Sequence, residues 1–431
     1  MFDSGGAGLT AYTYDDDDDL LSTTRGFSGA AGVLGTGVAT DYAYYPDGSL
    51  ETMSFPGLGT QFHSLDSSFP SGNTPTYTYD YNGIGQLNGM TNPFGDKPGW
   101  GYLGNGWMSA AGVVPAGSSS NTLWTYYQYD TRGFMTDLTN YAVPFGTEFS
   151  DYGGATYDAA GDRLTINPTM GSSGPSAYSG STSYVYDYLN ELTQETTTVF
   201  PATFTLGYNL AGNATDWDGT TRTFNADDQL TGLTGVTYDG NGNPSEYNPP
   251  WGSSDLTYDY ENRIASATSG GTDYTYSYDG DGVYDANGQS GTNLWFNIND
   301  VAGNPIVEFN SSGQIHAVNT WGANGLVGRY TRNNTYEAFY AYDMQGNTVQ
   351  HVLSNGTVDN WIRYLADGEG RVSTQNTVGA SIETYSNFGS QWGYRTDSPT
   401  GLEIVGNRFL DFNDGRWLTR DPIGQAGGVN T

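Results

Sequence analysis

The sequence predicts an all-β protein built from many short antiparallel hairpins, and three observations lead to that class. Tyr, Phe and Trp make up 15% of the 431 residues, and the 62 Gly residues suit the turns between strands. No long stretch places apolar residues at the 3.6-residue spacing of an amphipathic helix. A Tyr-Asp dipeptide recurs along the chain, each time followed by a short polar segment. A period in the twenties with variable insertions is typical of a solenoid-like array.

The chain is strongly acidic. It has 47 acidic and 14 basic residues, which gives a net charge of −33. A field of that sign repels phosphate backbones and anionic membrane surfaces, so nucleic-acid binding is not expected. The same charge keeps a Tyr-rich β surface soluble, and it would also attract cations, above all calcium. We therefore expect that the fold requires no cofactor and that calcium is the candidate ion.

Cysteine is absent, so the sequence excludes disulfides, zinc–thiolate sites and a cysteine nucleophile. No run of about 18 apolar residues exists, so no membrane-spanning helix is expected. The first residues, MFDSGGAGLT, lack the features of a signal peptide. The surface composition, poor in Lys and rich in Ser, Thr, Gly and Asn, still indicates an extracellular or cell-surface protein. Export would then be independent of a signal, or the chain would be part of a longer precursor.

Residues 1–75 are expected to form an atypical N-terminal β region. They contain one weak copy of the repeat, Tyr14-Asp15, followed by an acidic run from Asp15 to Asp19. Like charges repel one another unless a cation gathers them. The run is therefore interpreted as a solvated loop, with a metal site as the alternative.

Residues 76–384 are expected to form a spiral of repeated hairpins, with an irregular insertion rich in Gly, Pro and Trp at 91–121. Degenerate copies of the repeat occur at Tyr208-Asn209, Phe224-Asn225 and Phe309-Asn310. The repeat-defining pairs are Tyr79-Asp80, Tyr129-Asp130, Tyr157-Asp158, Tyr186-Asp187, Tyr238-Asp239, Tyr258-Asp259, Tyr278-Asp279 and Tyr342-Asp343.

One unit, TYTYDYNGIGQLNGMT, illustrates the expected hairpin. Alternation places Tyr77 and Tyr79 on one face of a strand. The carboxylate of Asp80 is expected to accept backbone N–H groups and start a turn, in which Gly83 or Gly85 supplies a positive φ. The tyrosines would then pack between neighbouring hairpins, and the aspartates would hold the turns.

Two turns alternate oxygen ligands with glycine, as loops that bind hard cations do. The candidate calcium ligands are Asp239, Asn241 and Asn243 in the first turn, and Asp279, Asp281 and Asp285 in the second. Neither turn has the twelfth-position glutamate of an EF-hand. Ordinary turns use the same residue types, and they are the favoured interpretation.

Other classes of site have little support. The three histidines lie far apart in the sequence, and no G-x-S-x-G motif is present, so an independent enzyme is not expected. Tyr and Trp bordered by Asp and Asn would suit stacking on sugar rings, which makes surface glycans candidate partners.

The repeats resemble the YD repeats of the Rhs (rearrangement hotspot) family, whose units read Y-x-Y-D-x-x-G-[RN]-[LI]. Residues 400–430 are similar to the Rhs repeat-associated core, T-G-L-x-x-x-G-x-R-Y-Y-D-P-x-x-G-R-[WF]-L-x-x-D-P-I-G, and the core domain is expected to comprise residues 385–431. Departures are mild: Phe409-Leu410 stands for Tyr-Tyr, and Phe412 stands for the proline. The motif positions that match include Gly401, Arg408, Asp411, Gly415, Arg416, Trp417, Asp421, Pro422 and Gly424.

The resemblance implies a spiralling sheet of hairpins that forms a tube, barrel or shell-like wall. In toxin members the core also carries an intramolecular aspartyl protease that releases a passenger. Arg420 and Asp421 match its Arg-Asp pair, in which the aspartate would act as acid and base. Aspartyl chemistry shares one proton between two carboxyl groups, and a partner acid is not identified in this chain. A structural ion pair is the alternative role.

These observations predict a non-enzymatic extracellular structural scaffold that assembles with copies of itself into a surface fibre or tube. The first alternative is the wall of a toxin-encapsulating Rhs shell, in which the chain would contact other segments of the shell and the core would release a passenger. The second alternative is a carbohydrate-binding adhesin.

Overall fold

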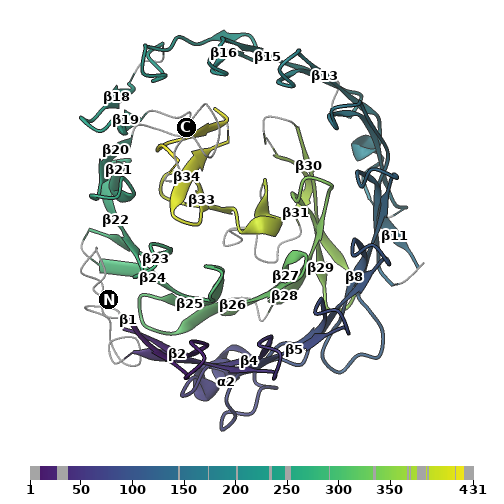
Figure 1. Cartoon of the computed structure of the whole chain (residues 1–431), viewed down its shortest axis with the longest axis vertical. Coiled ribbons are helices and arrows are strands. Elements are labelled where there is room, and N and C mark those ends of the chain that lie inside the picture. The colour runs from purple at the N-terminus through teal and green to yellow at the C-terminus, as the bar shows by residue number, and fades with distance from the viewer. Residues whose placement is uncertain are drawn as a thin grey trace.

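The computed structural model is almost entirely antiparallel β. It describes residues 10–26, 37–143, 146–172, 174–199, 202–232, 235–247, 254–290, 292–332, 336–365, 368, 370–375, 385, 388–412 and 414–421. Figure 1 shows the chain running once around a ring and then passing inside its own beginning. This arrangement confirms the predicted all-β class and the spiral of hairpins.

The first sheet forms most of the outer ring, and each strand pairs antiparallel with the next in the chain. Its strands are β1 (Thr10–Tyr14), β2 (Leu20–Arg25), β3 (Val38–Tyr44), β4 (Leu50–Ser54), β5 (Thr76–Tyr81), β6 (Leu87–Thr91), β7 (Lys97–Tyr102), β8 (Met108–Val114), β9 (Leu123–Tyr129), β10 (Met135–Tyr141), β11 (Glu148–Tyr157), β12 (Arg163–Met170), β13 (Thr182–Tyr186), β14 (Leu192–Thr197), β15 (Ala202–Tyr208), β16 (Ala214–Trp217) and β17 (Thr220–Thr221). The helix α2 (Gly59–Leu65) follows β4, and a 3-10 turn, η1 (Ser176–Tyr178), follows β12.

The second sheet completes the ring and then curls inside it. Its strands are β18 (Thr237–Tyr238), β19 (Pro244–Tyr247), β20 (Ser254–Tyr258), β21 (Ile264–Ser269), β22 (Thr272–Tyr278), β23 (Tyr284–Gln289), β24 (Thr292–Asn299), β25 (Pro305–Asn310), β26 (Ile315–Gly322), β27 (Gly325–Thr331), β28 (Tyr336–Tyr342), β29 (Thr348–Leu353), β30 (Val358–Tyr364) and β31 (Gly370–Gln375). A small third sheet follows the 3-10 turn η3 (Ser390–Trp392) and consists of β32 (Arg395–Thr396), β33 (Glu403–Val405), β34 (Arg408–Asp411) and β35 (Arg416–Trp417).

The hairpin turns share one geometry, which Asp130 illustrates. Its N–H donates to the carbonyl of Phe134 at 2.9 Å, and its Oδ1 accepts the N–H groups of Arg132 and Phe134. Gly133 has a φ of 96°. This is the three-residue hairpin loop in which a left-handed residue forms a bulge. The same side-chain contacts occur at Asp15, Asn82, Asn92, Asp158, Asp187, Asn209, Asn225, Asp239, Asp259, Asp279, Asp300, Asn310 and Asp343.

The tyrosine before the turn joins one hairpin to the preceding one. Tyr157 donates its hydroxyl to the carbonyl of Met135 at 2.6 Å, and Met135 opens the returning strand of the previous unit. Equivalent hydroxyl contacts to the preceding hairpin are made by Tyr44, Tyr102, Tyr186, Tyr208, Tyr238, Tyr258, Tyr278 and Tyr342. Each unit is therefore fixed to its neighbour by a side chain as well as by the strand ladder.

Three expectations from the sequence were wrong. Asp80 lies inside β5 opposite Gly89, and Asn82, two residues on, takes the turn position instead. The predicted irregular insertion at 91–121 contains the regular hairpin β7–β8. The first sheet also continues across residue 75, because β4 pairs with β5. Asn82 and Asn92 take the turn position of Asp, as does Leu103, and Thr91 stands in place of Tyr, so the Tyr-Asp pattern did not mark these units.

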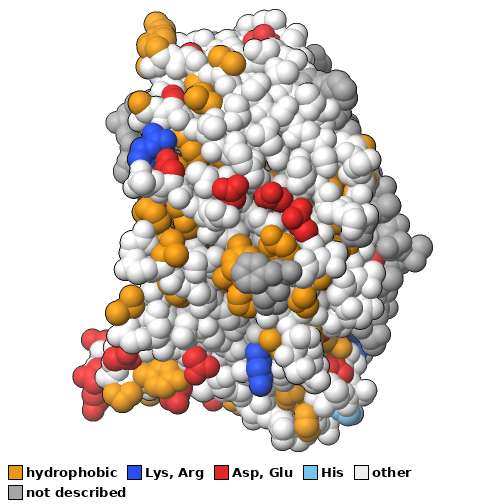
Figure 2. All heavy atoms as spheres, turned by 90° about the vertical axis from the view of Figure 1, so that its right-hand side faces the viewer, with side chains coloured by type: hydrophobic (Ala, Val, Ile, Leu, Met, Phe, Trp, Pro, Cys, Tyr) orange, Lys and Arg blue, Asp and Glu red, His pale blue; other side chains and the backbone are white. Residues whose placement is uncertain are grey.

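The second sheet lies on the inner face of the first, and side chains join the two layers (Figure 1). Tyr77 of β5 donates to the carbonyl of Asn319 in β26 at 2.7 Å. Asn140 of β10 donates to the carbonyl of Tyr342 at 3.0 Å. A large apolar core containing residues of both sheets fills the space between the layers. On the face shown in Figure 2, the charged side chains are mostly acidic and hydrophobic side chains are scattered.

Candidate functional site

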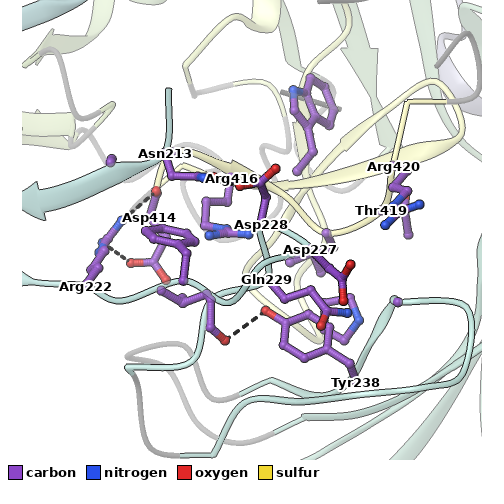
Figure 3. Close-up of a pocket in the computed structure, with 18 of the residues that line it drawn as sticks. Asn213, Arg222, Asp227, Asp228, Gln229, Tyr238, Asp414, Arg416, Thr419 and Arg420 are labelled. Carbon is purple, nitrogen blue, oxygen red and sulfur yellow. Dashed lines mark hydrogen bonds and ion pairs between the residues drawn. The ribbon is translucent and has the colours of Figure 1, made fainter. Parts of the chain in front are cut away.

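The third sheet lies inside the ring and packs on the inner face of β19–β23 (Figure 1). Leu402, Ile404 and Phe409 from this sheet share an apolar core with Leu256 and Ile264 of the wall. We call residues 395–421 the C-terminal domain. It meets the wall at a cavity of about 280 Å³, drawn in Figure 3, whose lining comes from both sides.

One wall of the cavity carries a buried network of charged and phenolic groups. Arg222 donates to Oδ1 of Asp414 at 2.5 Å and to the Asp414 carbonyl at 3.0 Å. The hydroxyl of Tyr247 lies 2.7 Å from Oδ2 of Asp411 and 2.9 Å from Oδ2 of Asp414. Burial and these two carboxylates raise the pKa of Tyr247 well above its usual value, so the phenol keeps its proton. We call this group the Tyr247 network.

Close packing accompanies the Tyr247 network. The guanidinium of Arg222 lies 4.7 Å from the centre of the Trp217 ring, and Arg416 lies 5.0 Å from the centre of the Phe224 ring. A Cβ added to Gly415, which has a φ of 61°, would lie 2.3 Å from the Trp217 ring. Glycine is required at 415 both by its backbone conformation and by the approach of this tryptophan.

A second contact fixes the other end of the C-terminal domain. Tyr276 of β22 donates to Oδ2 of Asp397 at 2.7 Å, and its ring meets Phe409 edge to face at 5.2 Å between ring centres. Asp397 is buried, and the hydroxyl of Thr400 also donates to it. Burial raises the pKa of Asp397 above its ordinary value. The wall thus holds the domain through two tyrosines, each bonded to a carboxyl group.

Arg420 and Asp421 are not paired with each other in the way the resemblance implied. Oδ2 of Asp421 accepts from Nη1 of Arg408 at 3.0 Å, and Arg408 also donates to the carbonyl of Thr419. The Arg408 guanidinium lies 4.2 Å from the centre of the Trp417 ring. Arg420 instead lines the cavity beside Thr419 (Figure 3). Asp421 therefore forms an ion pair with Arg408 near the end of the domain.

The remaining residues of the core motif lie in turns and strands of the C-terminal domain where the structure describes them. Gly401 has a φ of 71° in the turn before β33, and Asp411 is the last residue of β34 and is buried. Arg416 and Trp417 form β35. Pro422 and Gly424 lie outside the described residues.

The candidate calcium ligands occupy turns and ion pairs. Asp239 accepts the N–H groups of Asn241 and Asn243, together with the side-chain amide of Asn243. Asp281 accepts the Tyr12 hydroxyl, and Asp285 pairs with Arg25, both across the two layers. Within the described parts of the chain, no group of three or more His, Cys, Asp or Glu side chains is arranged to hold a metal ion. Calcium binding stays a prediction.

Sequence reasoning missed Tyr247, Arg222 and Asp414. Tyr247 and Asp411 are 164 residues apart in the sequence. No local signal marks such a pair. Only the spiral, which returns the C-terminal domain to the wall, brings these groups together.

The chain has detectable relatives, although no protein-family model matches it. It is 28% identical over 251 residues to the tRNA3(Ser)-specific nuclease WapA of Bacillus spizizenii and, over the same length, to the tRNA nuclease WapA of Bacillus subtilis. The matched part is 55% of this chain and 10% of either relative. The chain therefore corresponds to about a tenth of the length of these proteins.

Solved structures share the fold along nearly the whole chain. The crystal structure of TcdB2-TccC3-TEV superposes with a TM-score of 0.62 and 15% identity, covering 98% of this chain and 25% of that one. A Photorhabdus luminescens Tc holotoxin pore gives a TM-score of 0.61 and 14% identity, with the same coverage. No helix in the described residues is both long and apolar enough to cross a membrane. The chain thus has the β-spiral fold that these toxin complexes contain.

Proposed function

We propose that this chain is a segment of the wall of a hollow β-shell of the Rhs type. The observation that carries the proposal is the inward spiral, in which the second sheet lines the first and the C-terminal domain is held on the inner face. A wall of two layers buries both faces of its inner sheet, as the buried patterns of β25 and β26 show. The TcdB2-TccC3 fold and the similarity to WapA support this function.

The role of the C-terminal domain in the proposal is structural. Its buried carboxyl groups, Asp397 and Asp411, accept hydrogen bonds from the wall tyrosines, and Asp421 pairs with Arg408. These contacts hold the domain in place, so the chain is proposed to be non-enzymatic. Proteolytic release of a passenger, assembly into a fibre, glycan adhesion and the extracellular location stay predictions.

Electron microscopy of the native full-length protein tests the shell. We expect discrete hollow particles whose wall contains this chain, with the C-terminal domain inside. Long filaments with a regular axial repeat would contradict the proposal and favour the fibre. Imaging with and without a calcium chelator shows whether either assembly depends on the ion.

A further inference from the structure

The cavity beside the Tyr247 network contains an unusual share of the positive charge of the chain. The sequence has 14 basic residues against 47 acidic ones, and three of the basic residues, Arg222, Arg416 and Arg420, line this one cavity (Figure 3). Arg222 belongs to the wall, and the other two belong to the C-terminal domain. The positive charge therefore comes together only where the domain packs on the wall.

Arg416 presents charged donors that no carboxylate accepts. Its guanidinium lies over the Phe224 ring, 5.0 Å from the ring centre. Among the described residues, no carboxylate forms an ion pair with Arg416 or with Arg420, which is exposed to solvent. A guanidinium stacked on a ring keeps its in-plane N–H groups free, and two parallel N–H groups match the two oxygens of a carboxylate. Arg416 is thus arranged to bind an oxyanion.

Arg222 has a buried donor that no protein group satisfies. The residue is 4% exposed, its two Nη atoms bond to Asp414, and its Nε has no hydrogen-bond partner in the described parts of the chain. Burial lowers the pKa of Arg222, Asp414 opposes this shift, and the nearby charge of Arg416 adds to it. A bound anion would relieve the repulsion between the two guanidinium groups and supply the missing acceptor.

The rest of the lining limits the charge and the shape of the ligand. Asp227 and Asp228 also line the cavity, and Asp228 accepts the side-chain amide of Asn213 at 2.7 Å. Together with Asp414 they equal the three arginines in number, so a ligand with several negative charges would be repelled. The apolar part of the lining includes five aromatic rings, those of Tyr208, Trp217, Phe224, Tyr238 and Trp417.

We propose that this cavity binds a monocarboxylate with an apolar or aromatic body. The carboxylate would accept the paired N–H groups of Arg416 and lie next to Arg222, and the body would contact the aromatic rings. The cavity volume of about 280 Å³ is close to the lower end of the range for small-molecule sites, about 300 Å³. A free organic acid and a carboxyl side chain of a polypeptide share this chemistry. The inference does not depend on the shell, since it concerns binding by this chain alone.

Titration calorimetry on the whole chain tests the site with matched probes. N-acetylphenylalanine offers a carboxylate on an aromatic body, and N-acetylphenylalaninamide offers the same body without the charge. We expect the acid to bind at least about tenfold more tightly than the amide. A peptide with blocked ends and the sequence Gly-Glu-Phe-Gly presents the carboxyl group on a side chain. Tighter binding of the peptide than of the acid would identify a polypeptide as the source of the carboxylate, and the reverse order would identify a free acid.

Three variants of the chain test which residues bind the carboxylate. Arg416→Gln should lose at least about tenfold in affinity, because glutamine has no charged pair of donors. Asp227→Asn removes a negative charge from the exposed part of the lining and should tighten binding by up to about fivefold. The matched control is Arg132→Gln. Arg132 also lies over a ring, 4.7 Å from the centre of Phe134, but it pairs with Asp130 outside the cavity, and its loss should leave the affinity unchanged.

Four results would overturn the inference. They are failure of both carboxylate probes to bind, equal binding of the acid and the amide, tighter binding of inorganic phosphate than of either carboxylate probe, and equal affinity of Arg416→Gln and the unchanged chain. Thermal unfolding of each variant separates loss of the site from loss of the fold. If Arg416→Gln does not fold, a failure of Asp227→Asn to tighten binding contradicts the inference in its place. The particle shape seen by electron microscopy is independent of all these outcomes.

Discussion

A single side-chain oxygen organises each turn of the spiral. Oδ1 of the Asp or Asn accepts two backbone N–H groups, and the residue three positions on adopts a positive φ. Gly fills that position in many units, and Asn190, Asp228 and Asn262 fill it in others, with φ near 60°. Asn and Asp tolerate this conformation better than other non-glycine residues. The turn therefore requires a side-chain oxygen at one position and a positive φ three residues later, and residues other than Tyr-Asp can meet both requirements.

Removing that oxygen should weaken one hairpin locally. In Asp158→Ala the N–H groups of Ala160, Gly161 and Asp162, which lie 2.8–3.0 Å from Oδ1, lose their acceptor. We expect a loss of about 1 kcal/mol in the free energy of unfolding, measured by urea denaturation. Asp158→Asn keeps Oδ1 and should stay close to the unchanged chain. An equal loss in both variants would show that charge, and not the hydrogen bonds, holds the turn.

At the scale of elements, an acid pair joins the two layers. Asp96 follows β6 in the outer layer, and Glu337 lies in β28 of the inner layer, and both line a small cavity there. Burial and Asp96 raise the pKa of Glu337 well above its ordinary value, and Asp66 contributes in the same direction. Tyr330 and Arg329 line the same cavity, but Arg329 is committed to Glu308. Glu337 therefore keeps its proton at neutral pH and can donate it to Asp96.

This proton makes the contact between layers depend on pH. Above pH 4.5, the ordinary value for Glu337, the unfolded chain releases a proton that the folded chain retains. The contribution of Glu337 to stability is thus complete below that pH and falls as the pH rises, by up to about 1.4 kcal/mol per unit.

Urea denaturation at pH 5, 6, 7 and 8 measures how the free energy of unfolding depends on pH in the unchanged chain and in the Glu337→Gln variant. Glutamine has a similar shape and donates an N–H to Asp96 without titrating. The variant should gain stability relative to the unchanged chain as the pH rises. A constant difference between the two proteins would show that Glu337 is ionised in the folded state.

At the scale of the whole molecule, the C-terminal domain is held to the wall by few polar groups. The Tyr247 network and the Tyr276–Asp397 contact lie at opposite ends of it, with an apolar core between them. Each tyrosine bonds a carboxyl group that is buried from water. The loss of one donor would remove a hydrogen bond from a buried carboxyl group, and deletions of this kind are costly.

Tyr247→Phe should loosen the domain without unfolding the ring. We expect a loss of about 1–3 kcal/mol in docking, seen as at least tenfold faster hydrogen exchange in β33 and β34. The matched control is Tyr186→Phe, which removes a hydroxyl bond to Arg163 within the wall. If both variants exchange equally in β33 and β34, the Tyr247 network does not anchor the domain.

Much of the local structure follows from the sequence. The β class and the turn-holding role at Asp130 or Asp158 depend on contacts within about five residues. Other residue types take the same turn position at Asn82 and in the turns around β7 and β8, and the Tyr-Asp pattern did not identify those turns. The Arg420-Asp421 pairing was misjudged because Arg408, 13 residues away, reaches Asp421 instead.

The sequence by itself determined the repeating unit, because each turn and each tyrosine contact is made with adjacent segments of the chain. Only the tertiary structure decided the layers, the Tyr247 network and the Glu337–Asp96 pair. These join residues as far apart as Arg25 and Asp285, which nothing local relates. The physical reason is curvature: a small bend repeated at every hairpin accumulates over the chain, and it alone sets which distant strands meet.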